Sequence, residues 1–127
     1  MIVLDASVLI AHLDSRDALH RRAEEALTSV AAQRLAASPL TVAEILVGPA
    51  RVGHLDQAVG ALRTLGVSEV AFPPDTSARL AELRAKTGLK LPDCCVLLAA
   101  ETANADTVLT FDERLEAEAS RRGFGTG

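Results

Sequence analysis

Residues 2–7 read IVLDAS, and this stretch decides the fold. Its three consecutive apolar residues, 2–4, predict a short buried strand, because strands of a parallel sheet are covered on both faces. Asp5 ends this strand. A carboxylate next to core-forming side chains is costly unless a partner pairs with it or neutralises it. The first predicted element therefore ends in a candidate functional group.

Strands and helices alternate along the rest of the chain. This alternation predicts an α/β fold with a parallel sheet, and 127 residues are enough for a single domain. The Gly48-Pro49 pair is expected to end or kink the third helix. The expected strands are 2–4, 35–37, 67–72 and 107–110, and the expected helices are 6–13, one capped by Asp14 or Ser15, 40–47, 54–65, one capped by Asp75, 91–104 and one opening at Asp112.

Three further acidic residues stand in apolar surroundings. They are Glu44 in LTVAEILV (40–47), Asp93 in KLPDCCVLLAA (90–100) and Asp112 in TVLTFDERL (107–115). No Lys or Arg is equally placed, so a divalent cation is the simplest common partner. Carboxylate oxygens suit Mg²⁺ or Mn²⁺, and Mg²⁺ usually binds through a few carboxylates together with substrate phosphates. The pattern predicts phosphoryl chemistry.

The four carboxylates act together only if the fold brings them together. Ligands of open parallel sheets bind beyond the carboxyl ends of the strands, where the strand order reverses. Asp5 and Asp112 both follow strands at that end, and Asp93 lies at the start of a helix. If the first and last strands are neighbours, these three converge. Glu44 must then project from its helix toward the same place.

Each acidic residue also has a simpler explanation. Asp5, Asp93 and Asp112 stand where helices start, and an Asp there stabilises the helix through capping and the macrodipole. Glu44 lies past the first turn of its helix, so capping does not explain it, but it can simply face solvent. The conjunction of all four favours a common site over four separate explanations.

Four stretches in this order carry a resemblance to a known family: IVLDASVLIAHLD (2–14), SPLTVAEIL (38–46), LPDCCVLLAA (91–100) and VLTFD (108–112). The chain resembles the PIN-domain ribonucleases, and in particular the VapC-type toxins of prokaryotic toxin–antitoxin pairs. The resemblance spans nearly the whole chain. It implies a PIN-like three-layer α/β fold, with a parallel sheet of four to five short strands flanked by helices. The family usually adds a final strand, which the ending GFGTG leaves in doubt.

The resemblance also implies roles for individual residues. Asp5, Glu44, Asp93 and Asp112 would form an acidic quartet that binds Mg²⁺ or Mn²⁺, with Asp5 and Asp93 as direct ligands. The hydroxyls of Ser7 and Thr110 would orient carboxylates or waters. The implied partners are an RNA substrate and a cognate VapB-type antitoxin. A homodimer is expected as well, because two-fold symmetry is the commonest in oligomers, through helices rich in Ala and Leu.

Composition restricts where and how the protein acts. No apolar run approaches the length that spans a bilayer, and no secretory signal is present. The adjacent Cys94 and Cys95 are too close for an easy disulfide, which favours a reducing cytoplasm. Net charge is −4, unlike a protein that binds nucleic acid through a broad basic surface. The candidate local cations for RNA are Arg16, Arg51, Lys86, Lys90 and Arg114.

The predicted reaction is metal-assisted hydrolysis of an RNA phosphodiester, since no Ser/His/Asp or Cys/His arrangement offers a covalent route. A metal-dependent phosphatase is a less favoured alternative. Phosphatases with Asp after the first strand repeat it two residues later, where this chain has Ser7. A receiver domain would need an acidic pair near the first strand and a later Lys, and both are missing. The strongest alternative is a PIN-like binding or scaffold module without catalysis, and the complete quartet counts against it.

Overall fold

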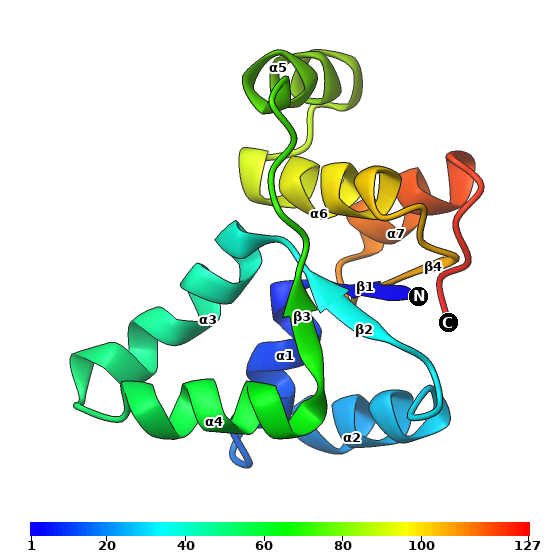
Figure 1. Ribbon diagram of the computed structural model, residues 1–127. Helices are drawn as coiled ribbons and strands as arrows, with labels where there is room; N and C mark the ends of the chain where they lie inside the picture. Colours follow the sequence, from blue (N-terminus) through cyan, green and yellow to red (C-terminus); the bar gives the residue numbers. More distant parts are fainter.

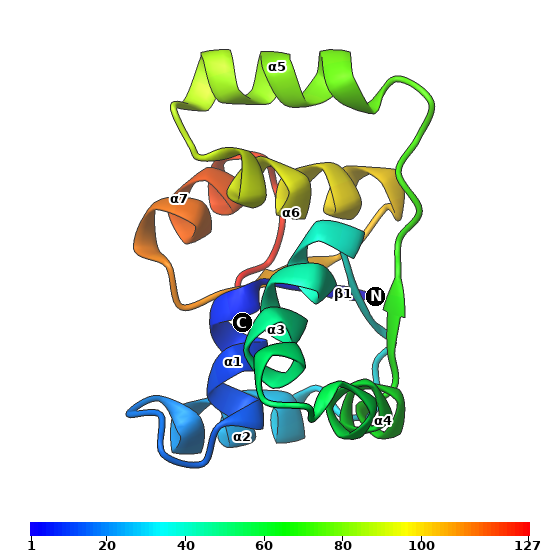
Figure 2. The ribbon, with the colours of Figure 1, turned by 90° about the vertical axis from the view of Figure 1, so that its left-hand side faces the viewer.

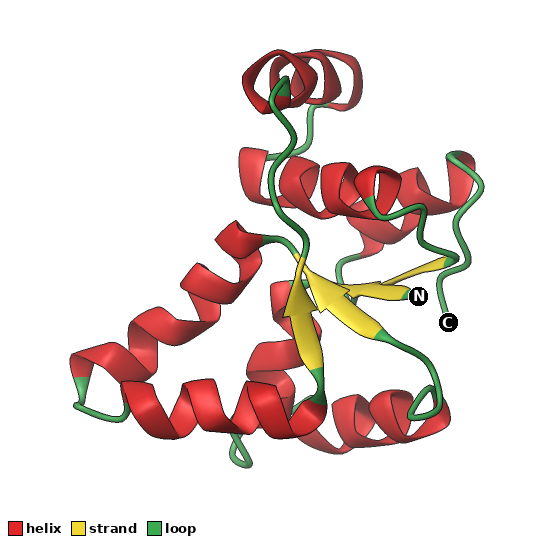
Figure 3. Cartoon of the chain, viewed as in Figure 1, coloured by secondary structure: helices red, strands yellow, loops and turns green.

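Helices alternate with short strands in the computed structural model, which describes all 127 residues (Figure 1). Helix predominates, and the strands form a small centre between the helices (Figure 3). In chain order the elements are β1 (Ile2–Leu4), α1 (Ala6–Leu13), α2 (His20–Ser29), β2 (Leu35–Ala37), α3 (Pro39–Arg51), α4 (Leu55–Leu65), β3 (Val67–Glu69), α5 (Thr76–Thr87), α6 (Leu91–Thr102), β4 (Thr107–Leu109) and α7 (Glu113–Arg121).

The strands form one parallel sheet in the order β3-β2-β1-β4. Ile2 of β1 pairs with Leu35 of β2 on one side and with Thr107 of β4 on the other. The chain first adds strands on one side of β1 and then returns to its other side with β4. The strand order therefore reverses between β1 and β4, and a ligand is expected beyond the carboxyl ends of these two strands. The prediction that the first and last strands are neighbours is confirmed.

Helices cover both faces of the sheet, which makes three layers. Val3 of β1 packs into one core cluster with Leu97 of α6 and Leu115 of α7, whereas Ile2 and Leu4 pack into a second cluster with α1 and α2. Figure 2 shows α6 and α7 on one side of β1, α1 and α3 on the other, and α5 lying over α6. All three β1 residues are at most 1% exposed, and burying each contributes about 2 kcal/mol. The α/β class and the covered first strand are as predicted.

Helix α3 begins as expected but runs further than expected. The Ser38 hydroxyl accepts a hydrogen bond from the Leu40 N–H at 3.2 Å, and Pro39 occupies the first turn, where its missing N–H is harmless. The expected end of the helix at residue 47 is wrong, because α3 continues to Arg51. Pro49 lies inside the last turn, where it lacks the N–H that would donate to the Ile45 carbonyl, and the helix ends two residues later.

Two other expected boundaries are wrong. Helix α2 begins only at His20, because Asp14 and Asp17 close local turns instead of capping it. Asp14 accepts from the Arg16 N–H, and Asp17 accepts from the Leu19 N–H. Strand β3 ends at Glu69, not residue 72. Beyond it the chain keeps one further hydrogen bond to β2, from the Val70 N–H to the Ala37 carbonyl.

The C-terminus meets the sheet edge without forming a strand. Gly125 forms an isolated parallel bridge to Thr107 of β4, and its carbonyl accepts a hydrogen bond from the Val108 N–H at 2.9 Å. The sheet therefore has four strands, the lower number expected. None of the helices combines the length and the apolar character needed to cross a bilayer.

Candidate active site

All four predicted carboxylates belong to elements that meet at the carboxyl ends of β1 and β4. Asp5 directly follows β1 and holds the N-cap position of α1, and Asp112 holds the N-cap position of α7 after β4. Asp93 lies in the first turn of α6, and Glu44 lies in the body of α3, which packs against α6. This is the place where the reversal of strand order predicts a ligand.

Asp5 is the anchored member of the four. It is 7% exposed, and its Oδ2 accepts hydrogen bonds from the Ser7 hydroxyl at 2.8 Å and from the Thr110 hydroxyl at 2.7 Å. Oδ1 accepts no hydrogen bond, yet no buried side-chain oxygen or nitrogen lacks a partner. Oδ1 therefore reaches solvent, and this oxygen is left for a ligand.

The two hydroxyls connect Asp5 to the loop after β4. The Phe111 N–H donates to the Ser7 hydroxyl at 3.0 Å, and the Asp112 N–H donates to the Thr110 hydroxyl at 2.9 Å. Each hydroxyl thus accepts from the backbone and donates to the same carboxylate oxygen. Hydrogen bonds to a charged acceptor are stronger than neutral ones, so this chain fixes Asp5 relative to Asp112. Ser7 and Thr110 stand where the expected orienting role requires.

Asp93 is half-buried, and the other three carboxylates affect the pKa of its carboxyl. Desolvation is the main cause that raises the pKa of its carboxyl from the usual 3.8 to about 6. The negative charges of Asp5, Asp112 and Glu44 raise it further, and Lys90 acts weakly in the opposite direction. Such effects require short distances. The four carboxylates therefore share one electrostatic environment.

Glu44 is exposed, but its carboxyl is not in free solvent. Desolvation first, and then the charge on Asp5, raises the pKa of Glu44 above its ordinary value. The effect of Asp5 indicates that the Glu44 carboxyl lies on the side of α3 that faces the Asp5 end of the site. A purely solvent-facing Glu would carry neither effect.

Capping explains only one of the three Asp residues at helix starts. Asp112 Oδ1 accepts a hydrogen bond from the Leu115 N–H at 3.0 Å, which is a true N-cap. Asp5 stands at an N-cap position without a capping hydrogen bond, and Asp93 accepts no hydrogen bond that caps α6. Asp112 therefore caps α7 and also belongs to the acidic group.

The chemistry of these groups fits a hard divalent cation. No Lys or Arg forms an ion pair with any of the four. As the side chains stand, however, no three His, Cys, Asp or Glu side chains are close enough to enclose a metal ion on their own. Unpaired carboxylates that do not enclose an ion on their own are compatible with Mg²⁺, because Mg²⁺ keeps several waters and needs only one or two direct carboxylate ligands. The carboxylates fit a hydrated cation better than a closed protein cage.

The predicted RNA-binding cations differ in how close they are to the acidic group. Lys90 acts on Asp93, and Arg114 lies in the first turn of α7, close behind Asp112. Arg16 pairs with Asp14, and Arg51 ends α3. Arg84 was not among the predicted residues although it stands in the last turn of α5, two residues before Lys86. The spacing of Arg84, Lys86 and Lys90 was the signal that could have found it.

A family model decides the classification. The model described as PIN domain matches residues 2–119. The chain belongs to the PIN domain family. The three-layer architecture and the four-stranded parallel sheet are those expected for a PIN domain, so the predicted resemblance to this family is confirmed.

Solved structures of similar shape include several toxins. A toxin–antitoxin complex from Klebsiella pneumoniae is 27% identical, with a TM-score of 0.73 over 88% of this chain and 87% of that chain. VapC20 of Mycobacterium tuberculosis, a toxin that cleaves the sarcin-ricin loop, is 18% identical, with a TM-score of 0.74 over 93% and 95%. VapBC2 from Rickettsia felis bound to a promoter DNA fragment is 17% identical, with a TM-score of 0.71 over 100% and 98%. No curated protein matches the PIN chain significantly.

Replacing Thr110 with Val is expected to destabilise the PIN fold. The substitution keeps the shape of the side chain but removes one donor to Asp5 and the acceptor of the Asp112 N–H. Losing a partner of a buried polar group costs about 1–3 kcal/mol. Urea denaturation should therefore give a lower free energy of unfolding. The exposed Thr64→Val is the matched control, and equal stabilities of the two variants would show that the hydroxyl is dispensable.

Replacing Asp93 with Asn is expected to stabilise the metal-free protein near pH 7. The folded state keeps the Asp93 proton up to about pH 6, whereas the unfolded chain releases it near 3.8. Wild-type stability therefore falls as pH rises through this window, and the loss is complete above it. After allowance for solvent screening, the variant gains on the order of 1 kcal/mol, or about 3–5 °C in Tm.

The gain should shrink toward pH 4, where Asp93 is protonated in the folded wild-type protein. Thermal melts in EDTA at pH 4 and pH 7 test this expectation. Asp112→Ala is the contrasting variant, because it removes a cap and should lower Tm by a similar amount. A fall in Tm for both variants at pH 7 would mean that Asp93 is a structural residue.

Proposed function

We propose that this PIN domain is an Mg²⁺- or Mn²⁺-dependent endoribonuclease and the toxin of a VapBC-type toxin–antitoxin pair. The observation that carries the proposal is the group of four carboxylates at the reversal of strand order, none of which has an ion-pair partner. Burial first, and then the charge on Asp5, raises the pKa of both Asp93 and Glu44. Four such carboxylates repel a phosphate unless a cation changes the local sign. The RNA cleavage named for VapC20 supports the choice of substrate.

The residues of this chain would supply the carboxylate ligands of the cation and hold them in place. Asp5, held by two hydroxyls, presents Oδ1 to solvent. Asp93 lies in the first turn of α6, and the charge on Asp5 acts on it. We assign these two as the direct metal ligands and Glu44 and Asp112 as the outer carboxylates. A bound divalent ion would lower the pKa of a water and stabilise charge on the leaving oxygen of the phosphodiester. The Ser7 and Thr110 hydroxyls keep Asp5 in one orientation during this work.

A partner that silences the nuclease belongs to the proposal. The complexes from Klebsiella pneumoniae and Rickettsia felis are toxin–antitoxin assemblies, and FitAB, 22% identical with a TM-score of 0.71, is bound to a DNA fragment. We infer a small VapB-type antitoxin whose Arg or Lys occupies the carboxylate group in place of the cation. A two-fold dimer through Ala- and Leu-rich helices is also inferred. The free, buried thiols of Cys94 and Cys95 support a reducing compartment such as the cytoplasm.

RNA cleavage by purified protein tests the proposed function. Wild-type protein should cleave a mixture of labelled RNAs in Mg²⁺ or Mn²⁺, and Asp93→Asn should not. Asp56→Asn, an exposed acidic residue in the first turn of α4, is the matched control and should cleave like wild type. Equal cleavage by wild type and Asp93→Asn would point to a contaminating nuclease, and no cleavage of any RNA would favour a binding module.

A further inference from the structure

A group of cations without carboxylate partners lies beside the acidic site. It consists of Arg84, Lys86, Lys90 and Arg114 and is called the basic turn here. Arg84 Nη1 donates to the Leu89 carbonyl at 2.8 Å, and Arg114 Nη2 lies 3.8 Å from the place where a Cβ on Gly88 would stand. None of the four forms an ion pair. The end of α5, the α5–α6 turn and the start of α7 therefore form one positive surface.

Five of the other nine Lys and Arg residues are in ion pairs, and the remaining four are spread along the chain. Arg22 stacks over the Phe111 ring at 4.7 Å from its centroid, and Arg34, Arg51 and Arg63 stand singly on separate elements. Those in ion pairs are Arg16, Arg21, Arg79, Arg121 and Arg122. In a protein of net charge −4, four unpaired cations in one place mark a surface for an anionic partner.

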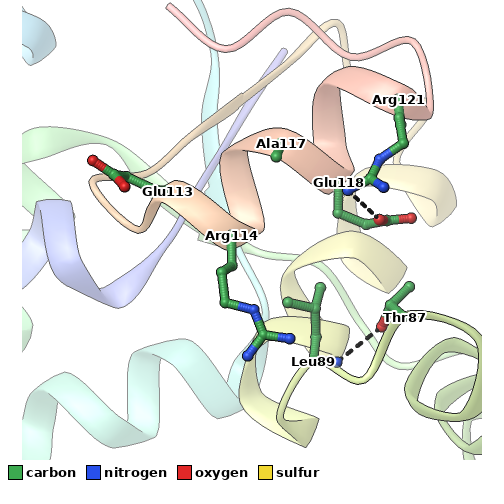
Figure 4. Close-up of a pocket in the computed structure, with 7 residues that line it drawn as sticks. All are labelled: Thr87, Leu89, Glu113, Arg114, Ala117, Glu118 and Arg121. Carbon is green, nitrogen blue, oxygen red and sulfur yellow. Dashed lines mark hydrogen bonds and ion pairs between the residues drawn. The ribbon is translucent and has the colours of Figure 1, made fainter.

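A depression of about 240 Å³ lies within this surface, between α7 and the α5–α6 turn (Figure 4). Figure 4 shows the Arg114 guanidinium extending toward Leu89 and the Glu113 carboxylate pointing away. Glu118, also in the lining, already pairs with Arg121 and Arg122. Arg114 is thus the uncompensated charge. The volume is below the roughly 300–1,000 Å³ of sites that enclose small molecules, so it suits one unit of a passing chain.

Two residues of the basic turn are close along the chain to the proposed catalytic group. Arg114 follows Asp112 by two residues, and Lys90 precedes Asp93 by three and acts electrostatically on it. A strand whose scissile phosphate lies at the carboxylates would place a neighbouring phosphate over the basic turn. Guanidinium groups bind phosphate oxygens in a bidentate manner, and backbone contacts of this kind position a nucleic acid without reading its sequence.

We propose that the basic turn binds the backbone of single-stranded RNA and that Arg114 positions a phosphate next to the scissile one. The inference rests on the proposed ribonuclease function and adds the path of the substrate. It explains how an acidic chain with few aromatic residues holds RNA: the cations are gathered at one side of the carboxylates instead of being spread over the surface.

Salt-dependent RNA binding tests this path. Asp93→Asn serves as the uncleaving parent, with a fluorescein-labelled single-stranded RNA of mixed sequence at fixed Mg²⁺, read by fluorescence anisotropy. Adding Arg114→Gln should weaken binding roughly fivefold and lower the slope of log K against log salt by about 0.7, the loss of one phosphate contact. Arg114→Lys keeps the charge and should retain the slope. Arg34→Gln removes an exposed cation just before β2, at the opposite end of the strands from the carboxylates, and should change neither quantity.

An unchanged slope for Arg114→Gln, or an equal loss for Arg34→Gln, would overturn the proposed path. A parent that binds no RNA even at low salt would overturn it as well. Wild-type cleavage of the same RNA, measured in parallel, decides the proposed function separately. If wild type cleaves the RNA but Arg114→Gln leaves the salt slope unchanged, only the role of Arg114 is disproved. If wild type does not cleave but Arg114→Gln lowers the slope, only the nuclease function is disproved.

Discussion

Chelation with EDTA is expected to abolish RNA cleavage by the purified PIN protein, and added Mg²⁺ or Mn²⁺ is expected to restore it. The carboxylates of Asp5 and Asp93 repel a phosphodiester and have no catalytic route to it without a cation. A bound cation lowers the pKa of water from about 15.7 to about 7, so we expect a loss of at least about a thousandfold. The measurement is the initial rate of cleavage of a labelled RNA, before and after the metal is returned.

Loss of fold must be separated from loss of metal in this experiment. Ionised Asp93 destabilises the metal-free protein near pH 7 by only on the order of 1 kcal/mol, which is small beside the roughly 5–15 kcal/mol of a typical domain. We therefore expect circular dichroism in EDTA to match that of the metal-loaded protein. Activity that survives thorough chelation would rule out the proposed mechanism. Activity that fails to return with either cation would rule out a reversible metal site of this kind.

Expression of the wild-type chain without a partner protein is expected to slow bacterial growth strongly. An RNA-cleaving toxin of this kind needs an antitoxin, and the similar complexes from Klebsiella pneumoniae and Rickettsia felis contain one. Glu44→Gln and Asp93→Asn should each relieve the inhibition, because each removes one of the four carboxylates that we propose as holding the cation. Viable counts after induction should differ by orders of magnitude between wild type and Asp93→Asn.

Matched expression makes the growth experiment decisive. Asp56→Asn should remain as toxic as wild type, since it lies on α4 and outside the acidic group. Co-expression of a small protein encoded beside the gene should restore growth, bind the toxin tightly and compete with Mg²⁺. Unhindered growth of cells that contain soluble wild-type protein, with no antitoxin-like reading frame nearby, would remove the toxin role and leave the fold assignment standing.

The parts of the fold that the sequence predicts well are those with a strong local signal. Residues 2–4 could only be a buried strand, and Ser38-Pro39 marks the start of α3 as the structure has it. The convergence of Asp5, Asp93 and Asp112 needed just one assumption, that β1 and β4 are neighbours, and the sheet order meets it. Topology and residue type together therefore located the acidic group.

Where prediction failed, several local solutions compete for the same residues. Asp14 and Asp17 have the chemistry of helix caps, but here they close turns ahead of α2. Gly48-Pro49 favours a helix end, yet α3 continues to Arg51, two residues beyond Pro49. Ser7 is two residues from Asp5 in the sequence, but Thr110 is 105 residues away. No periodic pattern in the sequence predicts the hydrogen bond between Thr110 and Asp5.

Direct binding of Mn²⁺ tests the central claim, that the four carboxylates hold a divalent cation. Electron paramagnetic resonance of free Mn²⁺ gives the dissociation constant without any RNA or turnover. Wild type and Asp56→Asn should bind Mn²⁺ equally, and Asp93→Asn and Glu44→Gln should each bind at least about tenfold more weakly. Equal binding by wild type, Asp93→Asn and Glu44→Gln would contradict the claim and place the cation elsewhere.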